Sequence, residues 1–235
     1  MNFTKPLPKF DPRSIPVLGI DDHLEGVPVD RLTPESLRRR FLHPPAWTPE
    51  RSVEKSFENR LPTAAAVLVP LVMRRELTLL LTQRSSQLST HPGQIAFPGG
   101  RTDASDLDAV DTALREASEE IGLPRGHVEV LGSLPTYVTG TAYIITPVVA
   151  LVQPGFELRP NPGEVADVFE VPLRYLMTPA HHRRHEFEFD GVTRQWLSMP
   201  YLERADEAEG SEAKERYIWG ATAGMLRNLY RFLSA

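Results

Sequence analysis

The stretch that most constrains this chain runs from Gly93 to Leu123, where a glycine turn leads into a helix rich in glutamate. Apolar side chains recur at spacings of four, three and four residues, which defines one helical face: Val110, Leu114, Ala117 and Ile121. Glu116, Glu119 and Glu120 fall on a separate stripe of the same helix. Like charges at these spacings destabilise a helix by about 0.2–0.5 kcal/mol per pair. Arg115 is the only basic residue inside the helix.

Two interpretations of this acidic stripe follow from the residues. The first is a solvated helix face, which is what most runs of charge are. The second is a site for a hard divalent cation, because carboxylate oxygens suit Mg²⁺ or Mn²⁺. Gly99 and Gly100 favour the second, since glycine allows the backbone to approach a ligand closely. We expect Glu116 and Glu120 to face solvent.

These residues resemble the signature of the Nudix hydrolases, G-x5-E-x7-R-E-U-x-E-E-x-G-U, in which U is a bulky apolar residue. The chain supplies Gly100, then Asp106 after five residues, and then the run REASEEIGL from Arg115 to Leu123. Three features depart from the signature. Asp106 stands where glutamate is usual, eight residues instead of seven separate it from Arg115, and Ala117 is smaller than usual. The extra residue is similar to the form of the signature in the coenzyme A diphosphatase branch.

A second motif points to the same branch. The segment LLTQRS, from Leu80 to Ser85, precedes Gly93 and the run FPGG that ends at Gly100. It resembles L-L-T-x-R-S-x3-R-x3-G-x3-F-P-G-G, the additional signature of Nudix enzymes that act on coenzyme A. Ser89 occupies the second arginine position, which puts the affinity for a substrate phosphate in question.

The resemblance implies a metal-dependent diphosphatase that converts coenzyme A or its thioesters into 3',5'-ADP and 4'-phosphopantetheine or its acyl form. It implies Mg²⁺ or Mn²⁺ bound by Glu116, Glu119 and Glu120, and substrate contacts from the segment that precedes the helix. The site residues expected from it are the catalytic Arg115, Glu116, Glu119, Glu120 and Glu164, and the substrate-binding Arg84, His91, Gly99 and Gly100. Arg115 is expected to orient the carboxylates rather than touch substrate.

Two alternatives stay open. One is a Nudix hydrolase for another nucleoside diphosphate derivative, an ADP-sugar or a dinucleoside polyphosphate, and Ser89 keeps it open. The other is a Nudix-fold module that binds a nucleotide without cleaving it. Loss of a glutamate from R-E-x-x-E-E would favour such a module, and none is lost.

Composition narrows the classes of partner. The net charge of −5 implies no general attraction to nucleic acid or to an anionic membrane. Without cysteine, the chain has no disulfide, thiol catalyst or cysteine-ligated metal. We found no membrane-length apolar run and no signal peptide, so we expect a cytoplasmic enzyme with a small-molecule substrate. A homodimer stays open.

The expected fold class is α/β, an α/β/α sandwich with a mixed β-sheet between helices. Residues 1–60 are expected to form an extension with a short helix over 34–42, packed on the protein or partly disordered, and residues 61–235 the hydrolase domain. Strands are expected over 64–73, 77–83, 128–134, 142–152 and 193–197, and a second long helix over 220–233. Pro70 predicts that the later half of its strand lies at an edge or bulge.

Three clustered histidines, His181, His182 and His185, suggest a zinc site, but the surrounding alternation favours an exposed strand start. Asp190 and Gly191 predict a two-residue hairpin turn into the following strand.

Overall fold

Strands from the whole length of the chain form two β-sheets in this computed structural model, which describes residues 11–50, 53–54, 61–88, 90–189, 192–203 and 213–235. The larger sheet contains β2 (Thr63–Met73), β3 (Leu77–Arg84), β4 (Ile95–Ala96), β5 (Gly99–Arg101), β6 (Val128–Ser133), β7 (Tyr137–Val138), β8 (Tyr143–Val152) and β9 (Val165–Pro172). The smaller sheet contains β1 (Val17–Ile20), β10 (Arg183–Phe189), β11 (Val192–Glu203) and β12 (Lys214–Trp219).

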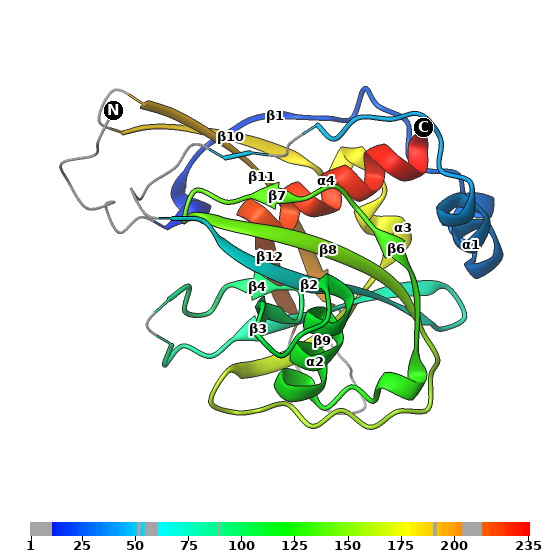
Figure 1. Cartoon of the computed structure of the whole chain (residues 1–235). Coiled ribbons are helices and arrows are strands. Elements are labelled where there is room, and N and C mark those ends of the chain that lie inside the picture. The colour runs from blue at the N-terminus through cyan, green and yellow to red at the C-terminus, as the bar shows by residue number, and fades with distance from the viewer. Residues whose placement is uncertain (1–10, 51–52, 55–60, 89, 190–191, 204–212) are drawn as a thin grey trace.

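The helices are α1 (Pro34–Leu42), α2 (Ala109–Ile121), α3 (Leu173–Leu176) and α4 (Gly220–Ser234), with short 3-10 turns at Pro12–Ser14, Val29–Arg31, Arg125–His127 and Pro179–His181. The two longest, α2 and α4, lie on opposite sides of the central strands β2 and β8 (Figure 1). This arrangement confirms the expected α/β architecture with a mixed sheet. None of the helices in the described ranges is long and apolar enough to cross a membrane.

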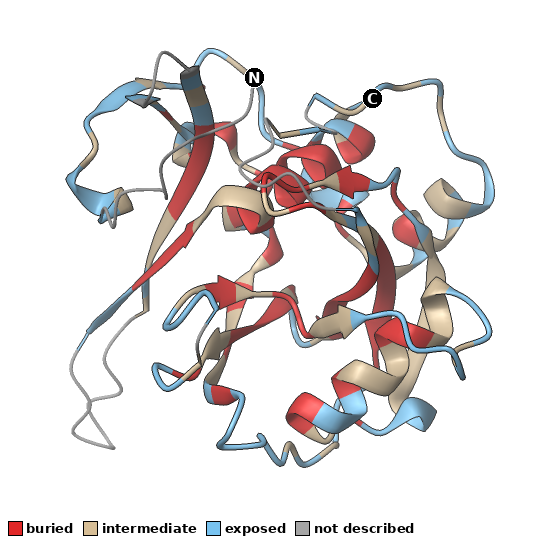
Figure 2. Cartoon of the chain, turned by 60° about the vertical axis from the view of Figure 1, so that its left-hand side comes forward, coloured by how far each residue is buried: buried red, intermediate tan, exposed pale blue. Residues whose placement is uncertain are grey.

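Strand β2 is buried on both faces because its side chains alternate between two cores. Ala66 and Leu68 pack in the cluster beneath α2, whereas Val67 and Val69 pack in the cluster beneath α4. Its backbone runs parallel to β8 along nearly its whole length. A near-continuous apolar run is what a strand covered on both faces requires. Buried residues accordingly follow the central strands and α4 in Figure 2.

Pro70 does not mark an edge, so that expectation is wrong. Residues Leu71–Met73 pair with β3 on one side, and β8 continues along the other. Pro70 falls between the β5 partners at Ala65–Val67 and the β3 partners. Its missing N–H therefore interrupts neither of these antiparallel ladders.

The sequence analysis predicted the hairpin of β10 and β11, but not that it joins β1 and β12 in a second sheet. Strand β1 belongs to the expected N-terminal arm, but it pairs with β10, so this part of the arm is an edge strand. The β10–β11 hairpin forms with Phe189 opposite Val192, and the predicted turn at Asp190 and Gly191 lies outside the described residues.

The three clustered histidines do not form an exposed strand start, which corrects a second expectation. His181 and His182 precede β10, and His181 is only partly exposed. His182 is completely buried and His185 is buried as well, because β1 and α4 cover the beginning of β10. His182 lies 3.0 Å from Arg227 on α4, and burial lowers its pKa to about 4. Within the described ranges no group of three histidine or acidic side chains is arranged around a metal position.

Helix α4 meets the larger sheet at very close range through Gly224. A Cβ atom placed on Gly224 would lie 2.5 Å from the hydroxyl of Tyr137 and 2.8 Å from its ring. Tyr137 is itself buried, and its hydroxyl donates to Glu54 at 2.7 Å. The glycine therefore sets how closely α4 approaches strand β7.

We expect Gly224→Ala to destabilise the protein by about 1–3 kcal/mol through overpacking against Tyr137. In an unobstructed helix the same change would stabilise by up to about 1 kcal/mol, so the sign of the effect is informative. Urea unfolding followed by circular dichroism measures it. Gly126→Ala is the control, because a Cβ there meets nothing within 4 Å. A stabilised Gly224→Ala variant would contradict the packing described here.

Candidate active site

A strand of two consecutive glycines brings the backbone of β5 into contact with the acidic helix. A Cβ atom on Gly100 would lie 2.5 Å from the carboxylate of Glu116, and one on Gly99 would lie 2.5 Å from the carbonyl oxygen of Ala66. Neither position can accept a side chain without movement of its neighbours. The sequence Gly99-Gly100 is therefore a steric requirement for packing β5 between β2 and α2.

Glu120 lies beneath this strand and is only 5% exposed, so the expectation that it faces solvent is wrong. Its Oε2 accepts a hydrogen bond of 3.1 Å from the backbone N–H of Gly99. Burial raises the pKa of Glu120 to about 7, and the nearby charges of Glu116 and Glu164 act in the same direction. The Gly99 N–H and Arg84 oppose this rise in pKa by stabilising the carboxylate.

Glu116 is also largely covered, with a side chain that is 16% exposed. Burial raises its pKa above the ordinary value, with Glu119 and Glu164 contributing and Arg115 opposing. Two adjacent carboxylates with raised pKa values form a site where the addition of positive charge is strongly favoured.

Arg115 connects the acidic residues around it. Its guanidinium donates to Asp106 at 2.8 and 2.9 Å, and it lies 2.9 Å from Glu116 and 3.0 Å from Glu119. It also donates to the backbone carbonyl of Arg101 at 3.1 Å. These contacts orient α2 relative to β5, and Arg115 is not among the residues that line the neighbouring cleft.

Asp106 shows how the chain accommodates its departure from the usual signature. Its side chain is almost fully buried, and it accepts two hydrogen bonds from Arg115. The hydroxyl of Thr112 and the backbone N–H of Asp103 donate to it as well. The bond to Arg115 holds the pKa of Asp106 well below its ordinary value. The shorter acid thus reaches Arg115 across a connection that is one residue longer.

The structure separates Glu119 from the other two glutamates of the stripe. Its side chain is 60% exposed, pairs with Arg115, and does not line the cleft. Glu164, on an exposed loop before β9, does line the cleft and is close enough to raise the pKa values of Glu116 and Glu120.

Arg84 and His91 lie on the same cleft. Arg84 ends β3, and its Nε is buried without a hydrogen-bond partner in the described part of the chain. Such an unsatisfied donor next to Glu120 is suited to an anionic ligand. His91 is exposed, adopts a positive φ of 55°, and contributes to the rim of the cleft.

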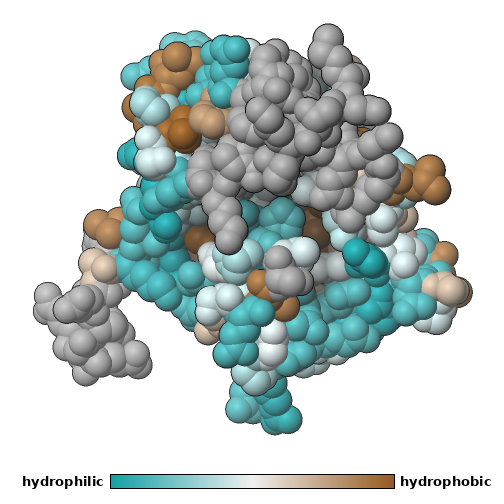
Figure 3. Space-filling view, turned by 90° about the vertical axis from the view of Figure 1, so that its left-hand side faces the viewer, coloured by the Kyte–Doolittle hydropathy of each residue, from teal (hydrophilic) through white to brown (hydrophobic). Residues whose placement is uncertain are grey.

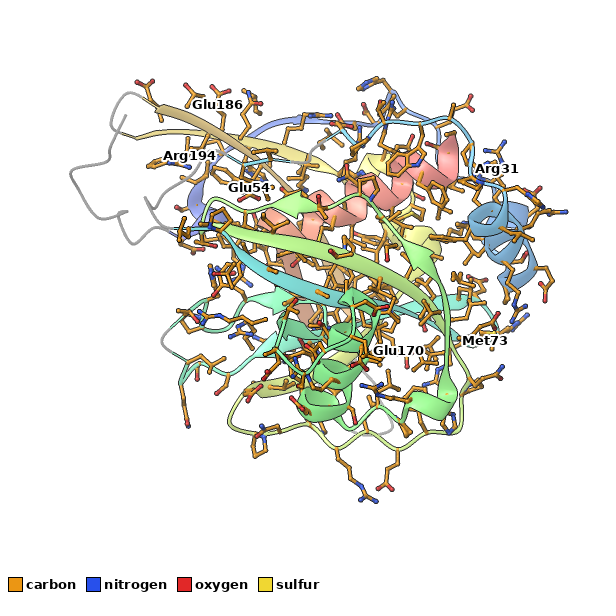
Figure 4. The ribbon with its side chains drawn as sticks, in the orientation of Figure 1. Arg31, Glu54, Met73, Glu170, Glu186 and Arg194 are labelled. Carbon is orange, nitrogen blue, oxygen red and sulfur yellow. The ribbon has the colours of Figure 1, made fainter. Side chains whose placement is uncertain are left out.

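The cleft has a volume of about 1620 Å³ and extends well beyond the glutamates. One wall comes from the larger sheet and includes Tyr137 and Tyr143. The opposite wall comes from the smaller sheet and was missed by the sequence analysis. It includes Phe187, Arg194, Trp196, Arg216, Tyr217 and Trp219. Figure 4 shows Arg194 near Glu54, which lies against β7 on the other side of the cleft. Most of the coloured residues in Figure 3 are hydrophilic.

The donor set fits a hard divalent ion. Glu116 and Glu120 line the cleft, offer only oxygen atoms, and repel each other in a partly desolvated setting. No three acidic or histidine side chains in the described ranges are already gathered at one point, and Glu119 pairs with Arg115. Two cleft-lining glutamates are therefore the core of the site.

A family model described as NUDIX domain matches residues 62–209, which is more than half of the chain. The chain is a member of the Nudix family. It is 41% identical over 166 residues to the uncharacterized Nudix hydrolase NudL of Escherichia coli K12, covering 70% of this chain and 80% of that one. The NudL of Citrobacter koseri is 40% identical over the same length. Among solved structures, the Caenorhabditis elegans Ap4A hydrolase in a binary complex has a TM-score of 0.41 at 20% identity, covering 50% of this chain and 85% of that one.

Membership gives the cleft its reaction class. The protein is a Nudix hydrolase that acts on phosphorus-containing anhydrides in nucleoside diphosphate derivatives. Nudix hydrolases generally use divalent ions such as Mg²⁺ or Mn²⁺, which agrees with the oxygen donors of Glu116 and Glu120.

In the metal-free Nudix enzyme we expect the stability of Glu120→Gln, compared with that of the wild type, to increase as pH rises from 5 to 8. The folded protein keeps the Glu120 proton up to about pH 7, whereas the unfolded chain loses it near pH 4.5. Through this group alone, the free energy of unfolding of the wild type is about 3 kcal/mol lower at pH 8 than at pH 5. Glutamine does not titrate, so the variant lacks this dependence on pH.

Thermal unfolding in EDTA at several pH values checks this expectation. Glu157→Gln provides a matched control, because Glu157 is a surface residue whose side chain is 81% exposed. A difference in Tm between wild type and Glu120→Gln that does not change with pH would refute the burial of this carboxylate.

We expect Asp106→Asn to lower turnover by about tenfold or more and to lower Tm, because Arg115 loses its doubly bonded partner and no longer fixes Glu116. Steady-state kinetics with a nucleoside diphosphate substrate gives the first quantity and calorimetry the second. Asp103→Asn, in the same loop, should change neither. Equal effects of the two substitutions would mean that the loop, and not the pairing with Arg115, matters.

Proposed function

We propose that this enzyme hydrolyses the diphosphate bond of coenzyme A or its thioesters, giving 3',5'-ADP and 4'-phosphopantetheine or its acyl form. The observation that carries the proposal is the position of Arg84. This arginine belongs to the segment that resembles the coenzyme A signature, and it reaches the cleft beside Glu120 with an unsatisfied buried N–H. The segment from Leu80 to Gly100 thus supplies β3, β4 and β5 to the catalytic end of the cleft.

The dimensions and lining of the cleft support the same substrate class. Coenzyme A combines a nucleotide, a diphosphate and a long pantetheine arm, so it needs a site that continues on both sides of the bond to be cleaved. The cleft extends from the glutamates to a wall on β10–β12 whose lining residues include Phe187, Tyr217 and Trp219. Aromatic rings are suited both to stacking on a base and to packing along an aliphatic arm.

The mechanism can be stated in terms of the residues of the chain. Glu116 and Glu120 would hold the divalent ion, with Glu119 as a further ligand if it leaves Arg115, and the ion supplies Lewis acidity toward phosphate oxygens and water. Arg84 donates its N–H to a phosphate oxygen and stabilises the negative charge on that oxygen. Gly99 and Gly100 let the backbone pass close to the phosphates. His91 contributes a polar contact at the rim of the cleft.

Water attacks one phosphorus atom, the bridging P–O bond breaks, and the proton of the water must be accepted. Glu164 lines the cleft and has no carboxylate-neutralising arginine among its described contacts, which suits it to orient or deprotonate that water. Arg115 stays behind the carboxylates and fixes their direction.

One observation favours a second candidate, a Nudix hydrolase of an ADP-sugar or a dinucleoside polyphosphate. Ser89 replaces an arginine of the coenzyme A signature, so part of the phosphate recognition would be lost. Ser89 itself lies outside the described residues. The two candidates share the catalytic end of the cleft and differ in what the remaining cleft must recognise.

Incubation with coenzyme A and Mg²⁺, followed by mass spectrometry of the products, tests the proposal, with ADP-ribose and a Mn²⁺ series in parallel. We expect 3',5'-ADP and 4'-phosphopantetheine, and a higher kcat/KM for coenzyme A than for ADP-ribose. Glu116→Gln should lower turnover by about 100-fold or more, since even residues behind metal ligands cost 10- to 100-fold. Glu157→Gln is the surface control.

Faster turnover of ADP-ribose would favour the second candidate. If neither compound is hydrolysed but 3',5'-ADP binds, the protein would be a nucleotide-binding module. Near-native activity of Glu116→Gln at limiting Mg²⁺ would show that the assignment of Glu116 as a metal ligand is wrong.

A further inference from the structure

Two of the arginines that line the cleft, Arg13 and Arg216, pair with carboxylates. Arg216 is buried between Asp167 at 2.7 Å and Glu203 at 2.6 Å. Arg13 pairs with Glu215 at 3.5 Å. These side chains are already satisfied, so they offer little binding energy to an incoming anion.

Arg101 differs from these arginines, because its guanidinium meets only a neutral partner in the described part of the chain. Its Nε and Nη2 donate to the hydroxyl of Tyr143 at 3.2 and 2.8 Å, and its guanidinium carbon lies 5.6 Å from the centre of that ring. Both residues line the cleft. The tyrosine holds the guanidinium in place without cancelling its charge.

The backbone of Arg101 is also fixed. It pairs with Ala65 in β2, and its carbonyl accepts a hydrogen bond of 3.1 Å from Arg115. Arg101 is therefore attached to the same arginine that orients the catalytic glutamates. An anion bound by Arg101 would be held at a defined position relative to the reacting bond.

Strand alternation sets Arg101 apart from the catalytic carboxylates. Gly100 faces Glu116, and the next residue along a strand faces the opposite side. The side chain of Arg101 accordingly extends toward β8 and Tyr143, whereas Arg84 lies close enough to Glu120 to oppose the rise in its pKa. Arg84 and Arg101 thus reach the cleft at two places, Arg84 beside the glutamates and Arg101 across the glycine strand.

We propose that Arg101, positioned by Tyr143, binds the phosphate monoester on the ribose of the nucleotide half of the substrate. This assignment rests on the proposed function, because this phosphate distinguishes coenzyme A from dephospho-coenzyme A and is absent from ADP-sugars. An arginine at this place also supplies a cation that the chain lacks at Ser89. The planar guanidinium can present two parallel N–H groups to a phosphate.

Steady-state kinetics with coenzyme A and dephospho-coenzyme A tests the proposal. The wild type should prefer coenzyme A, and Arg101→Gln should reduce that preference by about 10- to 100-fold through the KM for coenzyme A. The kcat values and the KM for dephospho-coenzyme A should change little. Arg84→Gln should impair both substrates together, and Arg159→Gln, a surface variant outside the cleft, should affect neither.

Tyr143→Phe separates the positioning of Arg101 by the tyrosine hydroxyl from the direct contact of Arg101 with the phosphate. It keeps the ring and removes the hydroxyl that holds Arg101, so it should raise the KM for coenzyme A by less than Arg101→Gln and leave dephospho-coenzyme A unchanged. Circular dichroism confirms that the variants fold. The proposal is overturned if Arg101→Gln affects both substrates equally or affects neither.

Calorimetric binding of 3',5'-ADP and 5'-AMP gives a readout that does not need turnover. The wild type should bind 3',5'-ADP more tightly, and Arg101→Gln should remove the difference. If coenzyme A is not hydrolysed but this difference depends on Arg101, the proposed reaction fails and the phosphate site stands. If coenzyme A is hydrolysed and the difference persists in Arg101→Gln, the reaction stands and the phosphate site fails.

Discussion

The packing of a two-glycine strand against an acidic helix is the constraint on which the site depends. Gly99 and Gly100 have no side chains, so β5 can lie against Glu116 and cover Glu120. This cover removes water from two neighbouring carboxylates, and desolvation raises the pKa of both. The fold therefore holds negative charge in a place where it is unfavourable by itself. A divalent ion at the cleft would offset that unfavourable charge.

The carboxylates keep their direction because Arg115 and Asp106 form a rigid support behind them. Asp106 is buried and accepts two hydrogen bonds from Arg115, which in turn contacts Glu116 and Glu119. Breaking such a buried pair leaves a charge without a partner, which is more costly than never burying it. The aspartate and the longer connection compensate for each other, so the contact with Arg115 is retained despite two changes to the usual signature.

Local sequence predicted α2 well, because its apolar spacing and its acidic stripe lie within a few turns of one helix. It could not predict the burial of Glu120, which the helix places off the apolar face and which β5 covers from outside the helix. The pairing of β1 and the formation of a separate second sheet were missed for the same reason. Strand β1 lies near the N-terminus and pairs with β10 far along the sequence, and His182 is covered by α4. Both contacts join distant parts of the chain, so neighbouring residues could not predict them.

Strand β5 connects the chemistry to the recognition of the substrate. Along this strand Gly100 faces Glu116 and Arg101 faces Tyr143, so consecutive residues serve opposite sides of the same backbone. A shift of one residue in its pairing with β2 would direct the arginine side chain at Glu116 and remove the glycine from the helix contact. The register of β5 is set by three residue pairs with β2, at Ala65, Ala66 and Val67. It thus fixes both how closely β5 approaches the carboxylates and where the guanidinium of Arg101 lies. Changes in the cleft wall on β10–β12 can alter what is bound without disturbing this register, because that wall belongs to the other sheet.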